Sequence, residues 1–187
     1  MGTRNLTVVF MDGEYRVAQY GQWDGYPEGQ GMICLHFLRD KMVRRQFIYY
    51  LDKMKYMNDD VIEEIQSSQI AKYCPEFSRD TGAEILQRIQ DDRITTRCLE
   101  NSLWFASDGL FCEWAYVIDL DSNTFEVYQG FNKTPLTMHD RFYFMQVANK
   151  PENGYYPVRM CASWDLDDLP TDEAFLAAFK DEDEDDE

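Results

Sequence analysis

The sequence has no hydrophobic run that approaches the roughly 18 residues of a membrane-spanning helix. Its N-terminus lacks the apolar core of a secretory signal, and Leu6 stands where a myristoylation motif requires Ser or Thr. These absences predict a cytoplasmic protein that has no membrane partner.

The sequence also lacks the spacing of a metal or cofactor site. Its five cysteines include no CxxC pair, and its only histidines are His36 and His139. The glycines Gly25, Gly29 and Gly31 match neither the P-loop nor the dinucleotide-binding fingerprint. We therefore expect reduced thiols, no metal ion and no cofactor.

Positive charge is scarce, with 18 Lys and Arg against 35 Asp and Glu, a net charge of −17. Such a balance argues against direct binding of nucleic-acid phosphates. The last seven residues, 181–187, are all acidic, and removing them from the net charge of −17 leaves −10 on the rest. Two interpretations stay open. The acidity keeps the protein soluble, or it directs the protein to a basic groove of another protein.

Hydrophobic residues make up 44% of the 187 residues, which is enough for one sizeable core. Residues 3–10 and 14–19 flank an Asp-Gly turn at 12–13, the strongest short signal for a β-hairpin. A second hairpin is predicted further along. Its first strand is the apolar segment 111–120, in which alternate residues share a face, and its second strand is the segment 124–131.

Between the hairpins, apolar residues recur at helical spacing on one face. The clearest run is Val43, Phe47, Leu51 and Met54. Further along, Thr81 and Glu84 match the capping box that opens a helix. These elements predict one α+β domain, residues 1–180, whose mixed or antiparallel sheet is built from the two β-hairpins and carries the helical middle section. An acidic disordered tail, residues 181–187, is expected to follow.

The segment 19–31 combines four glycines and a proline with large aromatic residues. Glycine and proline disfavour a helix, and buried rings disfavour a mobile loop. We therefore expect an ordered loop that presents side chains to a binding partner. The alternative is a purely structural turn held by its own rings.

The candidate binding residues are Gln22, Trp23, Asp24, Tyr26 and Glu28 in this loop, with Arg4 and Glu113 from the adjoining hairpins. Glu113 stands in the middle of the apolar strand predicted at 111–120, so it is expected either at a sheet edge or paired. A second hypothesis is a small hydrolase-like enzyme that uses carboxylates around the 19–31 loop, with Asp24, Glu113 and Arg4 about a pocket. No catalytic residue is assigned, because 35 acidic residues supply carboxylate pairs by chance.

The start Thr3-Arg4 and the segment from Trp23 to Gly31, Trp-Asp-Gly-Tyr-Pro-Glu-Gly-Gln-Gly, resemble a group of uncharacterised small proteins from phages and prophages. That group has a similar Thr-Arg start and an aromatic-Asp-Gly-Tyr-Pro-x-Gly-x-Gly segment, and the likeness covers about the first 40 residues. A His often stands there in place of Gln22, so this chain departs from the pattern at the position where a proton could be transferred. The resemblance implies a phage or mobile-element protein that acts in the host bacterial cytoplasm.

Some acidic phage proteins of this size are anti-CRISPR inhibitors of Cas9. Charge, size and phage-like character, and not a motif, suggest the same role here. Cas9-type nucleases hold their nucleic acids in channels rich in Arg and Lys. The expected function is therefore that of an acidic binding protein that inhibits a basic nucleic-acid-binding host protein, such as guide-RNA-loaded Cas9.

Overall fold

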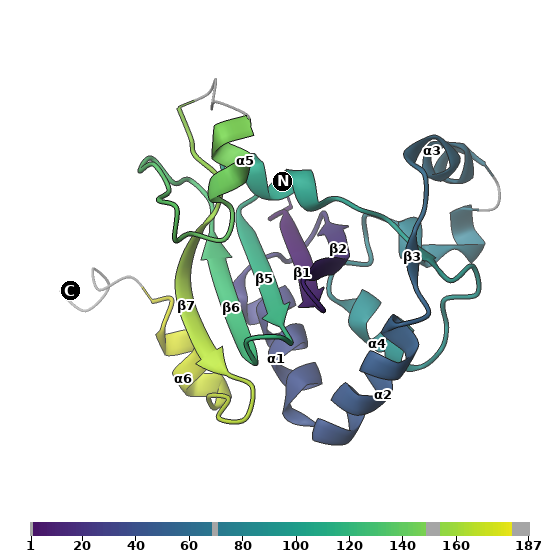
Figure 1. Cartoon of the computed structure of the whole chain (residues 1–187), viewed down its shortest axis with the longest axis horizontal. Coiled ribbons are helices and arrows are strands. Elements are labelled where there is room, and N and C mark those ends of the chain that lie inside the picture. Colours follow the sequence, from purple (N-terminus) through teal and green to yellow (C-terminus); the bar gives the residue numbers. More distant parts are fainter. Residues whose placement is uncertain (1, 69–70, 149–153, 181–187) are drawn as a thin grey trace.

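The computed structural model describes residues 2–68, 71–148 and 154–180, which form an α+β fold (Figure 1). A five-stranded sheet has the order β2-β1-β5-β6-β7. Its strands are β1 (Asn5–Met11), β2 (Glu14–Gly21), β5 (Trp114–Asp119), β6 (Thr124–Gln129) and β7 (Arg159–Asp165). The sheet is mixed, because β1 and β5 run parallel while the other neighbours are antiparallel. The predicted fold class is confirmed.

Both predicted hairpins are present and lie side by side. The β1–β2 hairpin closes at Asp12 and Gly13, whose φ angles of 56° and 75° are the left-handed pair that a tight two-residue turn requires. The β5–β6 hairpin turns through residues 120–123, and the Asp119 carboxylate accepts the backbone N–H of Asp121 there. The parallel contact of β1 with β5 joins the hairpins into one sheet.

The described residues contain six α-helices and a second, two-stranded sheet. The helices are α1 (Met32–Arg39), α2 (Lys41–Leu51), α3 (Asp59–Ser67), α4 (Glu84–Gln90), α5 (Tyr143–Ala148) and α6 (Asp172–Ala177). The small sheet pairs β3 (Lys55–Tyr56) with β4 (Cys98–Leu99). Short helical turns are η1 (Pro27–Gly31), η2 (Ala71–Tyr73), η3 (Pro75–Phe77) and η4 (Leu103–Ser107).

Two local predictions are wrong. Thr81 does not cap α4, because its hydroxyl donates to the carbonyl of Pro75 and the helix begins without a side-chain cap. Residues 27–31 were expected to resist helix formation, yet they form a short π-helical turn that runs directly into α1. Pro27 occupies the first position of that turn, where its missing N–H and fixed φ are tolerated.

The sheet is covered on both faces, which explains why β5 is apolar throughout. Tyr116 and Ile118 face the larger core, formed with α1, α2, α4 and α6. Ala115 and Val117 face a second core, formed with η4, α5 and the residues that follow β6. A small satellite core around Ile62 holds α3. The sheet is therefore the common wall of the two larger cores, and the α3 region packs separately.

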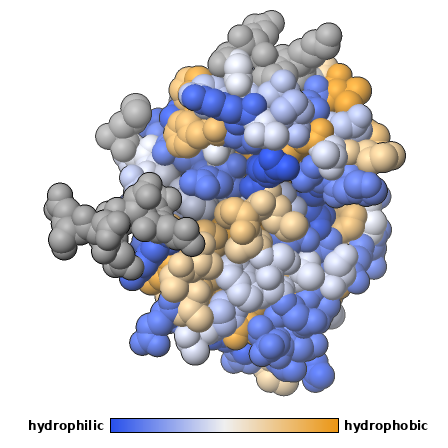
Figure 2. Space-filling view, turned by 90° about the vertical axis from the view of Figure 1, so that its left-hand side faces the viewer, coloured by the Kyte–Doolittle hydropathy of each residue, from blue (hydrophilic) through white to orange (hydrophobic). Residues whose placement is uncertain are grey.

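The outer strand β7 and helix α6 form one side of the molecule (Figure 1). In Figure 2 this side shows a band of hydrophobic residues that crosses its middle between hydrophilic areas. On β7, Met160 is 49% exposed, and Cys161 is exposed as well. The pKa of the Cys161 thiol is raised to about 11, mainly by burial of its sulfur, so the thiol stays protonated and weakly nucleophilic near neutral pH.

Within the described ranges, none of the helices combines the length and the apolar character that crossing a bilayer requires. No group of three His, Cys, Asp or Glu residues in the same ranges could hold a metal ion. The acidic tail predicted at 181–187 lies outside the described residues.

Candidate functional site

The segment between β2 and α1 lies at the end of the sheet where β1 begins and β2 ends. Its backbone is tied down over several residues. The N–H of Gly25 donates to the carbonyl of Thr3 at 2.9 Å, and the N–H of Gln30 donates to the carbonyl of Asp24 at 2.9 Å. We call residues 22–28 the binding loop, because they include the five predicted loop contacts.

Buried amides hold the same loop from inside. The side chain of Asn5, which is fully buried, donates to the carbonyls of Gly21 and Trp23. The side chain of Gln30 donates to the carbonyl of Trp23 and accepts the N–H of Ala83 at 2.7 Å. Because buried backbone groups need partners, these two amides fix the path of the chain around Trp23.

Tyr116 connects the loop to the middle of the sheet. Its ring is fully buried in β5, and its hydroxyl donates to the carbonyl of Gly25 at 2.7 Å. Burial raises the pKa of this phenol well above its usual value, so the hydroxyl keeps the proton that it donates. The loop conformation is therefore specified by the core.

The side chains that the loop exposes are large rings and carboxylates. Trp23 is 46% exposed and Tyr26 is 53% exposed, and Asp24 and Glu28 are also exposed. The indole N–H of Trp23 donates to Asp80 at 2.8 Å. Within the described part of the chain, neither Asp24 nor Glu28 accepts a side-chain hydrogen bond or forms an ion pair. Their charges are free to meet a cation from outside.

Gln22 differs from the other predicted loop contacts. It is half-buried, and its side-chain oxygen accepts the hydroxyl of Tyr20 at 2.7 Å. Its amide is thus already engaged within the chain. Of the five predicted loop residues, the structure turns four outward and uses Gln22 in part to support the loop.

Gly29 is the residue that allows the loop to close on itself. A Cβ atom at this position would lie 2.2 Å from the carbonyl oxygen of Asp24, a backbone atom that cannot move aside freely. We expect Gly29→Ala to lower the free energy of unfolding by about 1–3 kcal/mol, as overpacking does. Urea unfolding measures the effect. Glu28→Ala, which changes only an exposed side chain, is the control and should stay within about 0.5 kcal/mol.

Arg4 and Glu113 meet at the same end of the sheet. The backbone N–H of Arg4 donates to the Glu113 carboxylate at 3.2 Å, and the two side chains form an ion pair at 3.7 Å. Of the two alternatives for Glu113, a place at a sheet edge or a paired charge, the structure shows the pairing. The Arg4 guanidinium also lies 4.5 Å from the centre of the Phe111 ring. Asp24 forms no hydrogen bond or ion pair with either residue, so this arrangement does not favour the hydrolase hypothesis.

A second charged cluster, which no sequence pattern predicted, lies on the face of the sheet that also carries Ala115 and Val117. Arg141 forms ion pairs with Asp119 at 2.5 Å and with Glu126 at 2.9 Å. Tyr128 donates its hydroxyl to Glu126 at 2.6 Å. Burial opposes ionisation of Asp119, but the hydrogen bonds and charge of Arg141 hold the pKa of that carboxyl below its usual value. A pocket of about 370 Å³ lies over the cluster.

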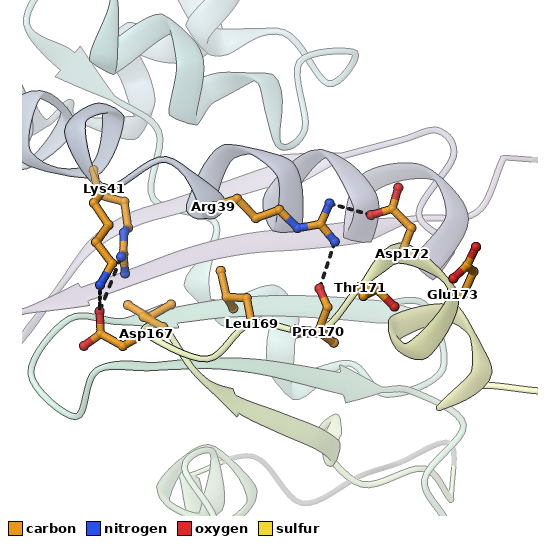
Figure 3. Close-up of a pocket in the computed structure, with 10 residues that line it drawn as sticks. Arg39, Lys41, Asp167, Leu169, Pro170, Thr171, Asp172 and Glu173 are labelled. Carbon is orange, nitrogen blue, oxygen red and sulfur yellow. Dashed lines mark hydrogen bonds and ion pairs between the residues drawn. The ribbon is translucent and has the colours of Figure 1, made fainter.

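A pocket of about 560 Å³ lies between the α1–α2 corner and residues 166–173 (Figure 3). Arg39 pairs with Asp172 at 2.6 Å and also donates to the carbonyl of Pro170. Lys41 pairs with Asp167 at 2.8 Å. The pKa values of Asp167 and Asp172 are lowered, chiefly by hydrogen bonds from Lys41 and from His36. The carboxylates already neutralise these cations, so the pocket does not attract an anion. The ion pairs instead hold the start of α6 against the α1–α2 corner.

Comparison of the chain with protein-family models, with curated proteins and with solved structures gave no match. The function proposed below therefore rests on the geometry of the binding loop and on the charge of the chain. The resemblance to the phage group stays an expectation from the sequence.

Proposed function

We propose that this chain is an acidic binding protein of a phage or other mobile element. It acts in the bacterial cytoplasm by binding, and so inhibiting, a basic nucleic-acid-binding host protein such as a Cas9-type nuclease. One observation carries the proposal. The binding loop is held in place by the core through Asn5, Gln30 and Tyr116, while its rings and carboxylates face outward.

A loop that is already ordered loses little conformational entropy when it binds, so more of its contact energy appears as affinity. Exposed Trp and Tyr side chains are the residue types that most often dominate binding energy at protein interfaces. The carboxylates beside them, on a chain of net charge −17, steer the protein toward a positively charged surface and raise the association rate.

The first prediction from this proposal concerns the loop. Trp23→Ala is expected to weaken partner binding about 30-fold, which corresponds to about 2 kcal/mol. Asp24→Asn removes one charge and should mainly slow association. Asn is chosen because Asp24 has a φ of 53°, a conformation that Asn adopts readily. Surface plasmon resonance gives both rates, and thermal unfolding checks that the variants fold.

Trp104→Ala is the matched control, because Trp104 is a 65% exposed tryptophan on η4, outside the binding loop. A similar loss of affinity in this control would show that the loop has no special role. Partners are captured from a bacterial lysate before and after nuclease treatment. A partner that is lost after nuclease treatment is bound through nucleic acid, which contradicts the proposal.

Salt is the second test of the proposal. Affinity should fall steeply between about 0.05 and 0.3 M salt, because the screening length drops below the spacing of exposed charges. An association that does not change with salt, or no association with any nucleic-acid-binding protein, would contradict an electrostatic inhibitor.

A further inference from the structure

The binding loop continues into a second group of exposed rings at the same end of the sheet. Gly2 lies against the Trp23 ring, since a Cβ atom on Gly2 would be 2.2 Å from it. Two residues on, Arg4 lies over Phe111, which is 45% exposed. We name Trp23, Arg4, Phe111, Glu113 and Phe131 the sheet-end surface.

Phe131 completes this surface, and its backbone is unusual. It is 50% exposed and has a φ of 54°, a left-handed conformation that bulky side chains rarely adopt. Its N–H donates to the carbonyl of Gly109, and the N–H of Gly130 donates to the carbonyl of Glu113. Neighbouring backbone thus holds an exposed ring in a costly conformation, and such strain gathers at functional sites.

The rings at this end of the molecule already bind cations from the chain itself. The Arg4 guanidinium lies 4.5 Å from the centre of the Phe111 ring, and the Lys133 ammonium lies 5.7 Å from that of Tyr155. Trp23 and Phe131 are about as exposed as Phe111, and neither has a cation over its ring among the described residues. Aromatic faces attract Arg more often than Lys, because the flat guanidinium stacks on a ring as well as carrying charge.

We infer that the sheet-end surface binds arginine side chains of its partner, with Trp23 and Phe131 as the two ring platforms. The exposed carboxylates of Asp24 and Glu28, in the same loop as Trp23, supply the opposite charge. This inference rests on the proposed function, because it assumes that the partner is basic. It goes further by naming arginine as the basic residue that the surface recognises. A surface that acted through net charge alone would not distinguish arginine from lysine.

The test uses the full chain and two labelled peptides of equal length and charge, oligo-arginine and oligo-lysine, in fluorescence anisotropy. Oligo-arginine is expected to bind about threefold to tenfold more tightly than oligo-lysine. Trp23→Ala and Phe131→Asn should each reduce that ratio toward one. Phe131→Asn is expected to keep the fold, because Asn adopts a positive φ more readily than Phe.

Phe144→Ala, which removes a 77% exposed ring on α5, is the matched control and should leave the ratio unchanged. Equal binding of the two peptides, or a ratio that Phe131→Asn and Trp23→Ala do not alter, overturns the inference. Neither result touches the proposed function, whose own test is capture of a basic partner. If the chain prefers oligo-arginine but no basic partner is captured, the inference about the sheet-end surface holds. The inhibitor proposal is then contradicted.

Discussion

Replacing Arg141 with Met is expected to lower the free energy of unfolding by about 3–5 kcal/mol, the range found when one partner of a buried ion pair is removed. The side chains of Asp119 and Glu126 are 4% and 11% exposed, and Arg141 is the cation that pairs with both. Met fills much of the same space but leaves two buried carboxylates without an opposite charge. Urea unfolding at neutral pH measures the loss.

The pH dependence of the stability loss in Arg141→Met shows whether the lost ion pairs cause it. In the native protein the pKa of Asp119 is lowered, so its contribution is present above the pKa of an unfolded Asp and is lost as pH falls through the lowered value. In Arg141→Met the buried Asp119 carboxylate loses its cation, so burial raises its pKa instead. The stability difference between the two proteins should therefore be large at pH 7 and shrink toward pH 3. An equal difference at both pH values would assign the loss to packing.

Arg93→Met serves as the control for this substitution. Arg93 pairs with Asp91 at 3.3 Å, but its side chain is 67% exposed. Water screens such a pair, so its removal should cost at most about 1 kcal/mol. The contrast between the two arginines tests whether burial, and not the mere presence of an ion pair, decides the effect.

Local signals in the sequence predicted much of the fold. The Asp-Gly turn and the alternating strands gave both hairpins, because turn chemistry and side-chain period act between near neighbours. In one of the two places where a local signal failed, a contact from elsewhere competed for the same atom. Thr81 matched a capping box, but its hydroxyl donates to Pro75, six residues away. Sequence spacing carries no information about such a competitor.

The candidate site was predictable in part for the same reason. Glycine, proline and aromatic residues marked the binding loop as ordered, but its anchors come from distant positions. Tyr116 is 91 residues from the Gly25 carbonyl that it binds, and Glu113 is 109 residues from Arg4. The Arg141 cluster was missed because its members lie on one face only after β5 and β6 pair, and none of them matches a motif.

The second large effect is expected at the centre of the larger core. Phe125→Ala should lower the free energy of unfolding by about 3–5 kcal/mol, the usual cost of truncating a buried Phe. The Phe125 ring is fully buried and stacks on Tyr116 and Phe175, with ring centres 6.5 Å and 6.0 Å apart. The substitution would open a cavity between β6 and α6 that rigid neighbours cannot fill.

Phe144→Ala makes the same chemical change on a side chain that is 77% exposed, and it should cost less than about 0.5 kcal/mol. Guanidinium unfolding of both variants measures the contrast, and equal losses would contradict the packing described here. Phe125→Ala also bears on binding, because Tyr116 holds the Gly25 carbonyl and loses its stacking partner. We expect faster amide hydrogen exchange at Gly25 and Gln30 in that variant. Unchanged exchange there would mean that the binding loop keeps its shape without support from the core.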